Sequence, residues 1–296
     1  MIKRINRLQV ALPRPEHGDP NAASAVQDLL GGKFGEMSTL NNYMFQSFNF
    51  RGKKKLKPFH DLIASISAEE FAHVELVSNT INLLTFGNTY PADPDAAPLQ
   101  EGKDARYSLY YTLQAQTAYP GDSMGRPWNG EYVTNTGVLV EDLLYNYMLE
   151  IGARTHKMRI YEMTDHPTAR ELCGFLLVRG GTHILAYAKA LEVATGVEVG
   201  KMLPVPSLDN YKFDAAKKYM DQGLHNILYT WDEPEYRDIR MIWKGKNPET
   251  GEQLRVVDEI PEGAPIPDFE EKPEQFAPGI DRDDYERILK RLLSNM

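Results

Sequence analysis

The sequence predicts an all-α fold built on an antiparallel bundle of four long helices. Three observations support this prediction: four segments with helical periodicity, their similar lengths, and the clustering of Pro and Gly between them. The segments run from about residue 22 to 50, between Pro58 and Gly87, from Gly137 to near Asp165, and from Pro167 to Gly196. Each can form about 28 residues of helix, roughly 40 Å long. Helices of equal length bury their apolar stripes completely when they pack side by side.

The connections between these segments predict the topology. A short loop rich in Gly and Lys joins the first two segments, and His166 and Pro167 lie in the connection between the last two, so each pair is expected to form a helical hairpin. Between the hairpins lie about 50 residues with five prolines, and proline breaks a helix interior. Residues 88–136 are therefore expected to form one long crossover, the connection that defines a ferritin-like bundle.

The two ends of the chain are expected to lie outside the bundle. Residues 1–21 would form an N-terminal arm, residues 22–196 the bundle, and residues 197–296 a C-terminal extension. The extension contains nine prolines, which leaves room for short helices at about 214–229 and 281–293. Because it still carries apolar residues, we expect it to pack on the bundle or on a neighbouring subunit.

Composition and charge exclude several classes of protein. With 42% hydrophobic and 25% charged residues, the chain is typical of a globular protein. A net charge of −9 has the wrong sign for binding nucleic acid or an anionic membrane, so neither is expected as a partner. The single cysteine, Cys173, excludes an intrachain disulfide and predicts a cytoplasmic protein. No stretch approaches 18 apolar residues, so no membrane-spanning helix is expected.

Acids and histidines interrupt the apolar stripe of each long segment. The candidate metal ligands are Glu36 on the first segment, Glu70 and His73 on the second, Glu150 on the third and His183 on the fourth. On the first segment the stripe is expected to run through Leu29, Lys33, Glu36, Leu40 and Tyr43. The spacing of Glu70 and His73 is a weak signal by itself, because chance expects about half of one such pair in this chain.

Buried carboxylates require cations, because an ionised acid without a partner is costly in an apolar interior. Three acids on inward stripes therefore predict two metal ions. Glu36 with Glu70 and His73 forms one half of the site, and Glu150 with His183 forms the other. Position 180, where a complete di-iron site would have a fourth carboxylate, is glycine. The glycines at 32, 35, 180 and 181 lie at the same depth and either open access to the site or allow close helix packing.

This ligand set resembles that of the manganese catalases, non-haem enzymes with a ferritin-like core. The resemblance covers residues 36–183 and extends to the tail phrase at residues 242–251. It implies two manganese ions per subunit, with Glu70 bridging both. Glu36 and His73 would complete one ion, and Glu150 and His183 the other. Hydrogen peroxide would be the substrate, disproportionated to water and dioxygen as the centre cycles between the II,II and III,III states.

The resemblance also implies roles for residues beside the metals. Tyr43 would donate a hydrogen bond to a ligand carboxylate. Some members carry an Arg and a Glu where this chain has Leu149 and Gly180. The chain therefore resembles the branch that has a lysine near the site, here Lys157, which lies two helical turns from Glu150 on the same face. The alternative for Lys157 is a side chain that extends to the surface.

Other properties follow from the resemblance or stay open. It implies a homo-oligomer, a hexamer whose tails wrap neighbouring subunits. Calcium binds in part of the family, but no clear motif defines a site here; Asp61 would be one contributor. The ligand types alone do not distinguish manganese from iron. The three tryptophans are expected to anchor the crossover and the tail.

Two other functions are compatible with the same residues. One is a di-iron ferritin-like oxidase or ferroxidase, which the glycine at position 180 disfavours. The other is a structural coat or shell protein that kept the bundle.

Overall fold

The computed structural model describes residues 5–16, 18–86, 117–231, 236–268 and 282–296. This part of the chain is mostly helical. The helices are α1 (Pro20–Gly31), α2 (Glu36–Phe48), α3 (Lys57–Phe86), α5 (Leu139–Met163), α6 (Pro167–Thr195), α7 (Asp214–Asp221) and α9 (Arg282–Ser294). Short 3-10 helices are η2 (Gly130–Tyr132), η3 (Val199–Met202), η4 (Leu224–Asn226) and η5 (Arg237–Met241). The strands are β1 (Arg7–Leu8), β2 (Ile227–Tyr229), β3 (Arg255–Val257) and β4 (Ala264–Pro265).

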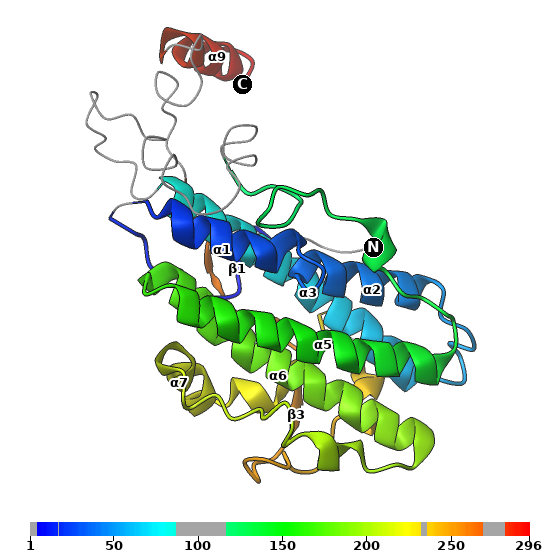
Figure 1. The fold of residues 1–296 in the computed structure, drawn as a ribbon. Helices are drawn as coiled ribbons and strands as arrows, with labels where there is room; N and C mark the ends of the chain where they lie inside the picture. Colours follow the sequence, from blue (N-terminus) through cyan, green and yellow to red (C-terminus); the bar gives the residue numbers. More distant parts are fainter. Residues whose placement is uncertain (1–4, 17, 87–116, 232–235, 269–281) are drawn as a thin grey trace.

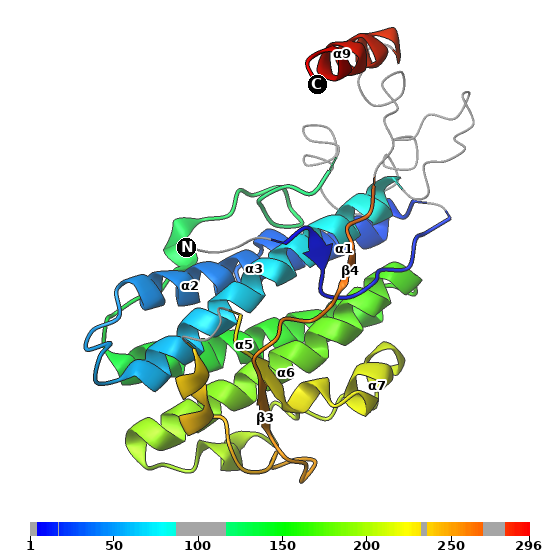
Figure 2. The same ribbon diagram turned by 180° about the vertical axis from the view of Figure 1, so that it is seen from behind.

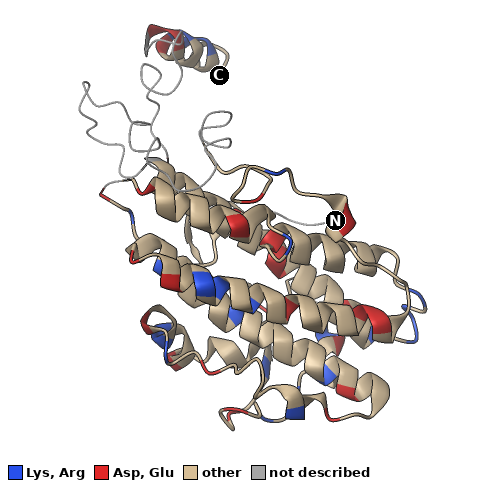
Figure 3. Ribbon diagram, viewed as in Figure 1, with Lys and Arg blue, Asp and Glu red and all other residues tan. Residues whose placement is uncertain are grey.

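The long helices form a bundle of two hairpins. In Figure 1, α1 and α2 follow one another along α3, and α5 lies beside α6. The hairpins meet because α3 packs on α6 and because α1 and α2 pack on α5. Acidic and basic residues are interspersed along the helices (Figure 3). Among the described residues, none of the helices is both long enough and apolar enough to span a bilayer.

The prediction of one continuous first helix is wrong, because this segment is broken into α1 and α2. Residues 32–35 are not helical, and the flanking Gly32 and Gly35 have extended backbone with ψ of 163° and 170°. A Cβ on Gly31 would lie 2.3 Å from the carbonyl oxygen of Gly121, so the described end of the crossover packs directly on this backbone. Lys33 is consequently exposed rather than on the inward stripe. The break makes Glu36 the first residue of α2, where the helix dipole favours a negative charge.

The crossover was expected at about residues 88–136, and residues 87–116 lie outside the described residues. Its described part runs along the outside of α1 and α2. Gln27 donates hydrogen bonds to the carbonyl oxygens of Tyr119 and Gly121 at 2.5 and 2.6 Å. Trp128 donates its indole N–H to Ser38 at 3.0 Å, so this tryptophan anchors the crossover as expected.

The C-terminal extension packs on the bundle through several short elements. Helix α7 packs on α6 and η5 packs on α3. Strand β2 pairs in parallel with β3, and β4 pairs antiparallel with β1 of the N-terminal arm. Figure 2 shows this arm and the extension crossing the same side of the bundle. The helix expected at 214–229 stops at Asp221 and gives way to η4 and β2. Trp243 is buried and donates to two backbone carbonyls of the extension, which confirms its anchoring role.

The buried interior has two apolar clusters along the bundle. One contains Leu29, Leu76 and Leu176, and the other contains Tyr43, Ile66 and Tyr187. In α3, α5 and α6 the candidate ligands fall between the residues that contribute to one cluster and those that contribute to the other. Glu36 lies between α1, which contributes to the first cluster, and Tyr43, which belongs to the second. The polar site is therefore enclosed by apolar packing at both ends.

Candidate metal centre

The structure brings the five predicted ligands together in the middle of the bundle. Their ligand atoms form two groups, Glu36 with Glu70 and His73, and Glu70 with Glu150 and His183, and within each group all atoms lie within 4.8 Å of one another. Glu70 belongs to both groups. Every one of the five side chains is 0–1% exposed. Four separate helices supply them, so the site exists only when the bundle is assembled.

Each histidine turns its Nδ1 atom toward the ligand carboxylates. Nδ1 of His73 lies 3.3 Å from Glu70 Oε2 and 3.5 Å from Glu36 Oε2. Nδ1 of His183 lies 2.7 Å from Glu70 Oε1 and 3.4 Å from Glu150 Oε1. Glu70 thus places one oxygen in each half of the site, as a bridging carboxylate requires.

Several polar atoms in this cluster lack hydrogen bonds, which fits metal binding. Within the described part of the chain, Glu36 Oε2, Glu150 Oε2 and His183 Nδ1 are buried and make no hydrogen bond of acceptable geometry. Buried polar atoms are normally satisfied, and the exceptions need an explanation. Carboxylate oxygens and imidazole nitrogens converging in this way are ligands for a divalent transition metal.

The charges of the cluster also fit metal binding. Four buried carboxylates, Glu36, Glu69, Glu70 and Glu150, face two permanent cations, Lys157 and Arg179. Four ionised carboxylates need two more positive charges than Lys157 and Arg179 provide, which protons on the two histidines or bound metal ions would supply. Burial lowers the pKa of His73, but Glu70 and Glu36 outweigh it and raise this pKa to about 9. Two divalent ions would replace those protons and leave charge for anionic oxygen ligands.

Lys157 is part of the site and not a surface lysine. Its side chain is 1% exposed, and its ammonium lies 2.8 Å from Glu36 Oε1. Gly180 provides the space beside it: a Cβ at position 180 would lie 3.6 Å from the Lys157 nitrogen and 3.8 Å from Glu150 Oε2. A lysine therefore lies where the missing fourth carboxylate would point, and it adds a cation beside the ligands.

Two hydroxyl groups hold ligand carboxylates in place. Tyr43 donates a hydrogen bond to Glu150 Oε1 at 2.8 Å, the contact that the resemblance implied. Thr39 donates to Glu70 Oε2 at 2.7 Å, which the sequence analysis did not predict. Thr39 lies three residues after Glu36 and shares its side of α2, so helical spacing could have identified it.

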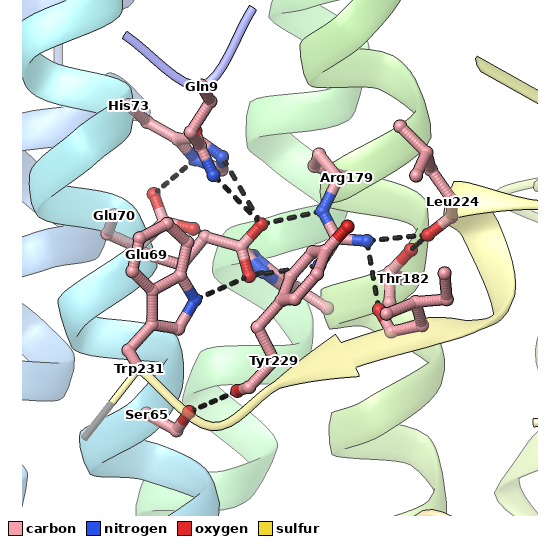
Figure 4. Close-up of polar contacts among 12 residues, drawn as sticks. Gln9, Ser65, Glu69, Glu70, His73, Arg179, Thr182, Leu224, Tyr229 and Trp231 are labelled. Atoms are coloured by element: carbon pink, nitrogen blue, oxygen red, sulfur yellow. Dashed lines mark hydrogen bonds and ion pairs between the residues drawn. The ribbon is translucent and has the colours of Figure 1, made fainter. Parts of the chain in front are cut away.

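Sequence reasoning also missed a buried ion pair between Glu69 and Arg179 (Figure 4). The guanidinium donates to both oxygens of Glu69, at 2.6 Å to Oε1 and 2.9 Å to Oε2. Burial opposes ionisation of Glu69, but Arg179 and His183 hold its pKa well below the usual range. Trp231, expected only to anchor the tail, donates its indole N–H to Glu69 Oε2 at 3.3 Å.

A spacing signal for this pair was present in the sequence. Glu69 precedes His73 by four residues, and Arg179 precedes His183 by four. Residues four apart share a helix face, so Glu69 and Arg179 each lie one turn before a candidate ligand histidine. The two residues carry opposite charges and can therefore pair. The long apolar run around Arg179 was a further indication that its charge is buried and paired.

The contacts of Asp61 do not favour a calcium site at this residue. Its carboxylate is 1% exposed and forms an ion pair with Lys57, and His60 Nδ1 lies 3.1 Å from its other oxygen. The cation that balances Asp61 is therefore a lysine of the same helix.

Comparison with known proteins identifies the family of the chain. The whole chain, residues 1–296, matches the family described as manganese-containing catalase. A manganese catalase from Lactiplantibacillus plantarum is 36% identical over 197 residues, 65% of this chain and 71% of that protein. A manganese catalase from Bacillus subtilis (strain 168) is 30% identical over 278 residues, 91% of this chain and 97% of that protein.

A solved structure with a similar fold is KatB, a manganese catalase from Anabaena. It matches with a TM-score of 0.56 and 23% identity, over 66% of this chain and 81% of that chain. This likeness confirms the predicted all-α, ferritin-like fold. Because the family match spans the whole chain, the chain belongs to the manganese-containing catalase family.

Proposed function

We propose that this protein disproportionates hydrogen peroxide to water and dioxygen at a dinuclear manganese centre. The five residues that would hold the two ions are Glu36, Glu70, His73, Glu150 and His183. The observation that carries the proposal is the pair of buried ligand groups that share Glu70. Membership of the family and the manganese catalases among the relatives support manganese as the metal and peroxide as the substrate.

The reaction requires two electrons and two protons in each half. Manganese, when bound, supplies a two-electron couple between the II,II and III,III states. One hydrogen peroxide accepts two electrons and two protons and becomes two water molecules. A second gives up two electrons and two protons and leaves as dioxygen. The protein must therefore stabilise the charge of the metal centre and keep other ligands away from it while protons enter and leave.

Lys157 and Tyr43 are suited to donate hydrogen bonds rather than to accept protons. Burial disfavours the charged form of Lys157, but Glu36, Glu150 and Glu70 outweigh it and raise its pKa above the usual range. Its ammonium can therefore donate to a peroxide oxygen. Burial and the charge of Glu150 raise the pKa of Tyr43 well above its usual range, which keeps the phenol protonated. The proton transfers are accordingly assigned to solvent in the site.

The di-iron alternative has less support. A fourth carboxylate is absent at Gly180, and the buried ammonium of Lys157 lies in its place. A positive charge at this position favours a centre with fewer carboxylates. The coat or shell alternative needs no open ligand atoms, and the unsatisfied oxygens of Glu36 and Glu150 disfavour it.

The deciding experiment combines metal analysis with oxygen release. Purified protein loaded with manganese should contain two manganese ions per chain and release dioxygen from peroxide with no haem absorption. Glu70→Gln should lose the second ion and turnover, whereas Glu141→Gln, a matched change at an exposed position of α5, should change neither. Loaded protein that releases no dioxygen would end the proposal. Iron-dependent oxidation with no peroxide turnover would favour the oxidase.

A hexameric assembly is part of the same proposal, as the family resemblance implies. The chain mass is 33.6 kDa, so light scattering distinguishes a monomer from a hexamer directly. A monomer at working concentration would contradict this assignment without affecting the metal centre.

A further inference from the structure

Glu69 lies between the outer nitrogens of the two ligand histidines. Nε2 of His183 is 3.3 Å from Glu69 Oε2, and Nε2 of His73 is 3.7 Å from Glu69 Oε1. Neither nitrogen completes a hydrogen bond to any described residue, so these are contacts between charged groups and not hydrogen bonds. One carboxylate therefore faces both histidines, one oxygen to each.

Arg179 fixes this carboxylate from the opposite side. Its forked contact with both oxygens defines the plane of the Glu69 carboxylate. The remaining nitrogen, Nη1, donates to the carbonyl oxygens of Leu224 and Ile227 at 2.5 and 2.9 Å. These carbonyls belong to η4 and β2, so the C-terminal extension positions the guanidinium (Figure 4).

The N-terminal arm and the C-terminal extension also contact Glu69 directly. Gln9 of the N-terminal arm donates to Oε1 at 3.4 Å, and Trp231 of the extension donates to Oε2 at 3.3 Å. The same two side chains line a surface pocket of about 600 Å³ on the outside of α3. They lie between this pocket and the carboxylate, which is 1% exposed. The arm and the extension thus keep water from competing for the oxygens that face the histidines.

We propose that Glu69 is a positioning residue that orients both ligand histidines, and that the N-terminal arm and the C-terminal extension hold it in place. The proposal rests on the proposed function in taking His73 and His183 as metal ligands. A carboxylate that accepts from the outer N–H of a ligand histidine fixes its tautomer, holds the ring toward the metal and strengthens it as a donor. Here a single carboxylate does this for both halves of the centre.

Because one carboxylate faces both histidines, we expect a specific effect of its removal on metal affinity. Loss of an outer partner of a ligand histidine typically weakens metal binding about 10- to 100-fold. Because Glu69 faces both rings, Glu69→Gln should weaken both binding steps, whereas a residue serving one histidine would weaken one. Trp231→Phe removes a single N–H donor and leaves the ion pair intact, so it should weaken binding by up to about tenfold.

The test uses the full-length protein and two metal probes. Manganese(II) affinity is measured for both steps by competition with a chelator, and cobalt(II) absorption in the visible range reports the geometry of the histidine ligands. The matched control is Glu171→Gln on α6, which removes a mostly buried carboxylate that contacts Tyr219 and Lys218, away from the site. This control should keep the wild-type affinity and cobalt spectrum.

The outcomes separate the two proposals. Weaker binding in both steps with a shifted cobalt spectrum in Glu69→Gln supports the positioning role. Wild-type affinities and an unchanged spectrum in that variant would overturn it and leave the catalase proposal standing. If Glu69→Gln does not fold, the same two measurements are made on Trp231→Phe. Weaker manganese binding in that variant supports the positioning role, and wild-type affinities with an unchanged cobalt spectrum overturn it. Failure of the wild-type protein to bind two ions would instead overturn the proposed function.

Discussion

Replacing Lys157 with Met tests the charge balance of the site. Met is similar in length but uncharged, so Lys157→Met removes the ammonium that lies 2.8 Å from Glu36 Oε1 and leaves most of the packing. Both side chains are 0–1% exposed, which places this ion pair among the buried ones. Removing one partner of a buried pair typically costs about 3 to 5 kcal/mol. Burial already raises the pKa of Glu36, so proton uptake by this carboxyl should bring the cost toward the lower value.

The same change should have the opposite effect on metal binding. In the manganese-loaded protein Glu36 has a second cation as its partner, and the ammonium repels that cation. Lys157→Met should therefore destabilise the metal-free protein by about 3 kcal/mol and the loaded protein by less. By linkage, manganese must then bind the folded variant more tightly than it binds the wild type.

The assay is urea unfolding of the metal-free and manganese-loaded forms, with manganese affinity measured separately. Lys217→Met is the control, because Lys217 is 50% exposed and pairs at 2.6 Å with Asp214, which is 85% exposed. Exposed pairs contribute under about 1 kcal/mol, so this control should change both forms little and equally. Equal destabilisation of the two forms by Lys157→Met, or weaker manganese binding, would refute the reasoning.

Three further variants test packing and orientation. Gly180→Ala should stabilise the protein by up to about 1 kcal/mol in urea unfolding, because α6 gains helix propensity and the new Cβ meets atoms at 3.6 Å or more; a destabilised variant would mean that this space is needed. Gly174→Ala, in the same helix, should destabilise, since its Cβ would lie 2.6 Å from the backbone of Ala215, and an unchanged midpoint would contradict that close contact. Tyr43→Phe removes the hydrogen bond to Glu150 and should lower stability by about 1.5 to 3 kcal/mol, the range for bonds to charged groups. A change below 0.5 kcal/mol would show that the bond contributes little.

The long helices were predictable because their signals are local. Periodicity, Pro167 at the start of α6 and Gly196 in the left-handed conformation at its end, with φ of 74°, are all properties of neighbouring residues. The inward placement of the acids and histidines followed from the same spacing. Residue types then indicated two metals, because buried acids require cations.

The break between α1 and α2 depended on a distant contact. Its glycines were visible in the sequence, but the backbone at Gly121 that packs against Gly31 comes from the crossover, about 90 residues later. Only the assembled fold brings these two segments together. Intrinsic helix propensity is a weak term, about 1 kcal/mol per glycine, and such tertiary contacts override it.

The sequence by itself determined the fold class, three of the four long helices and the identity of the five candidate ligands, because each depends on composition and helical spacing. The resemblance implied a bridging Glu70 and a lysine near the site, but tertiary structure alone decided that the two Glu70 oxygens face different halves and that Lys157 lies buried beside Glu36. It also decided that Glu69 is held by Arg179 and by residues from both ends of the chain. These are contacts between side chains far apart in sequence, and their charges are stabilised only once packing has removed water from around them.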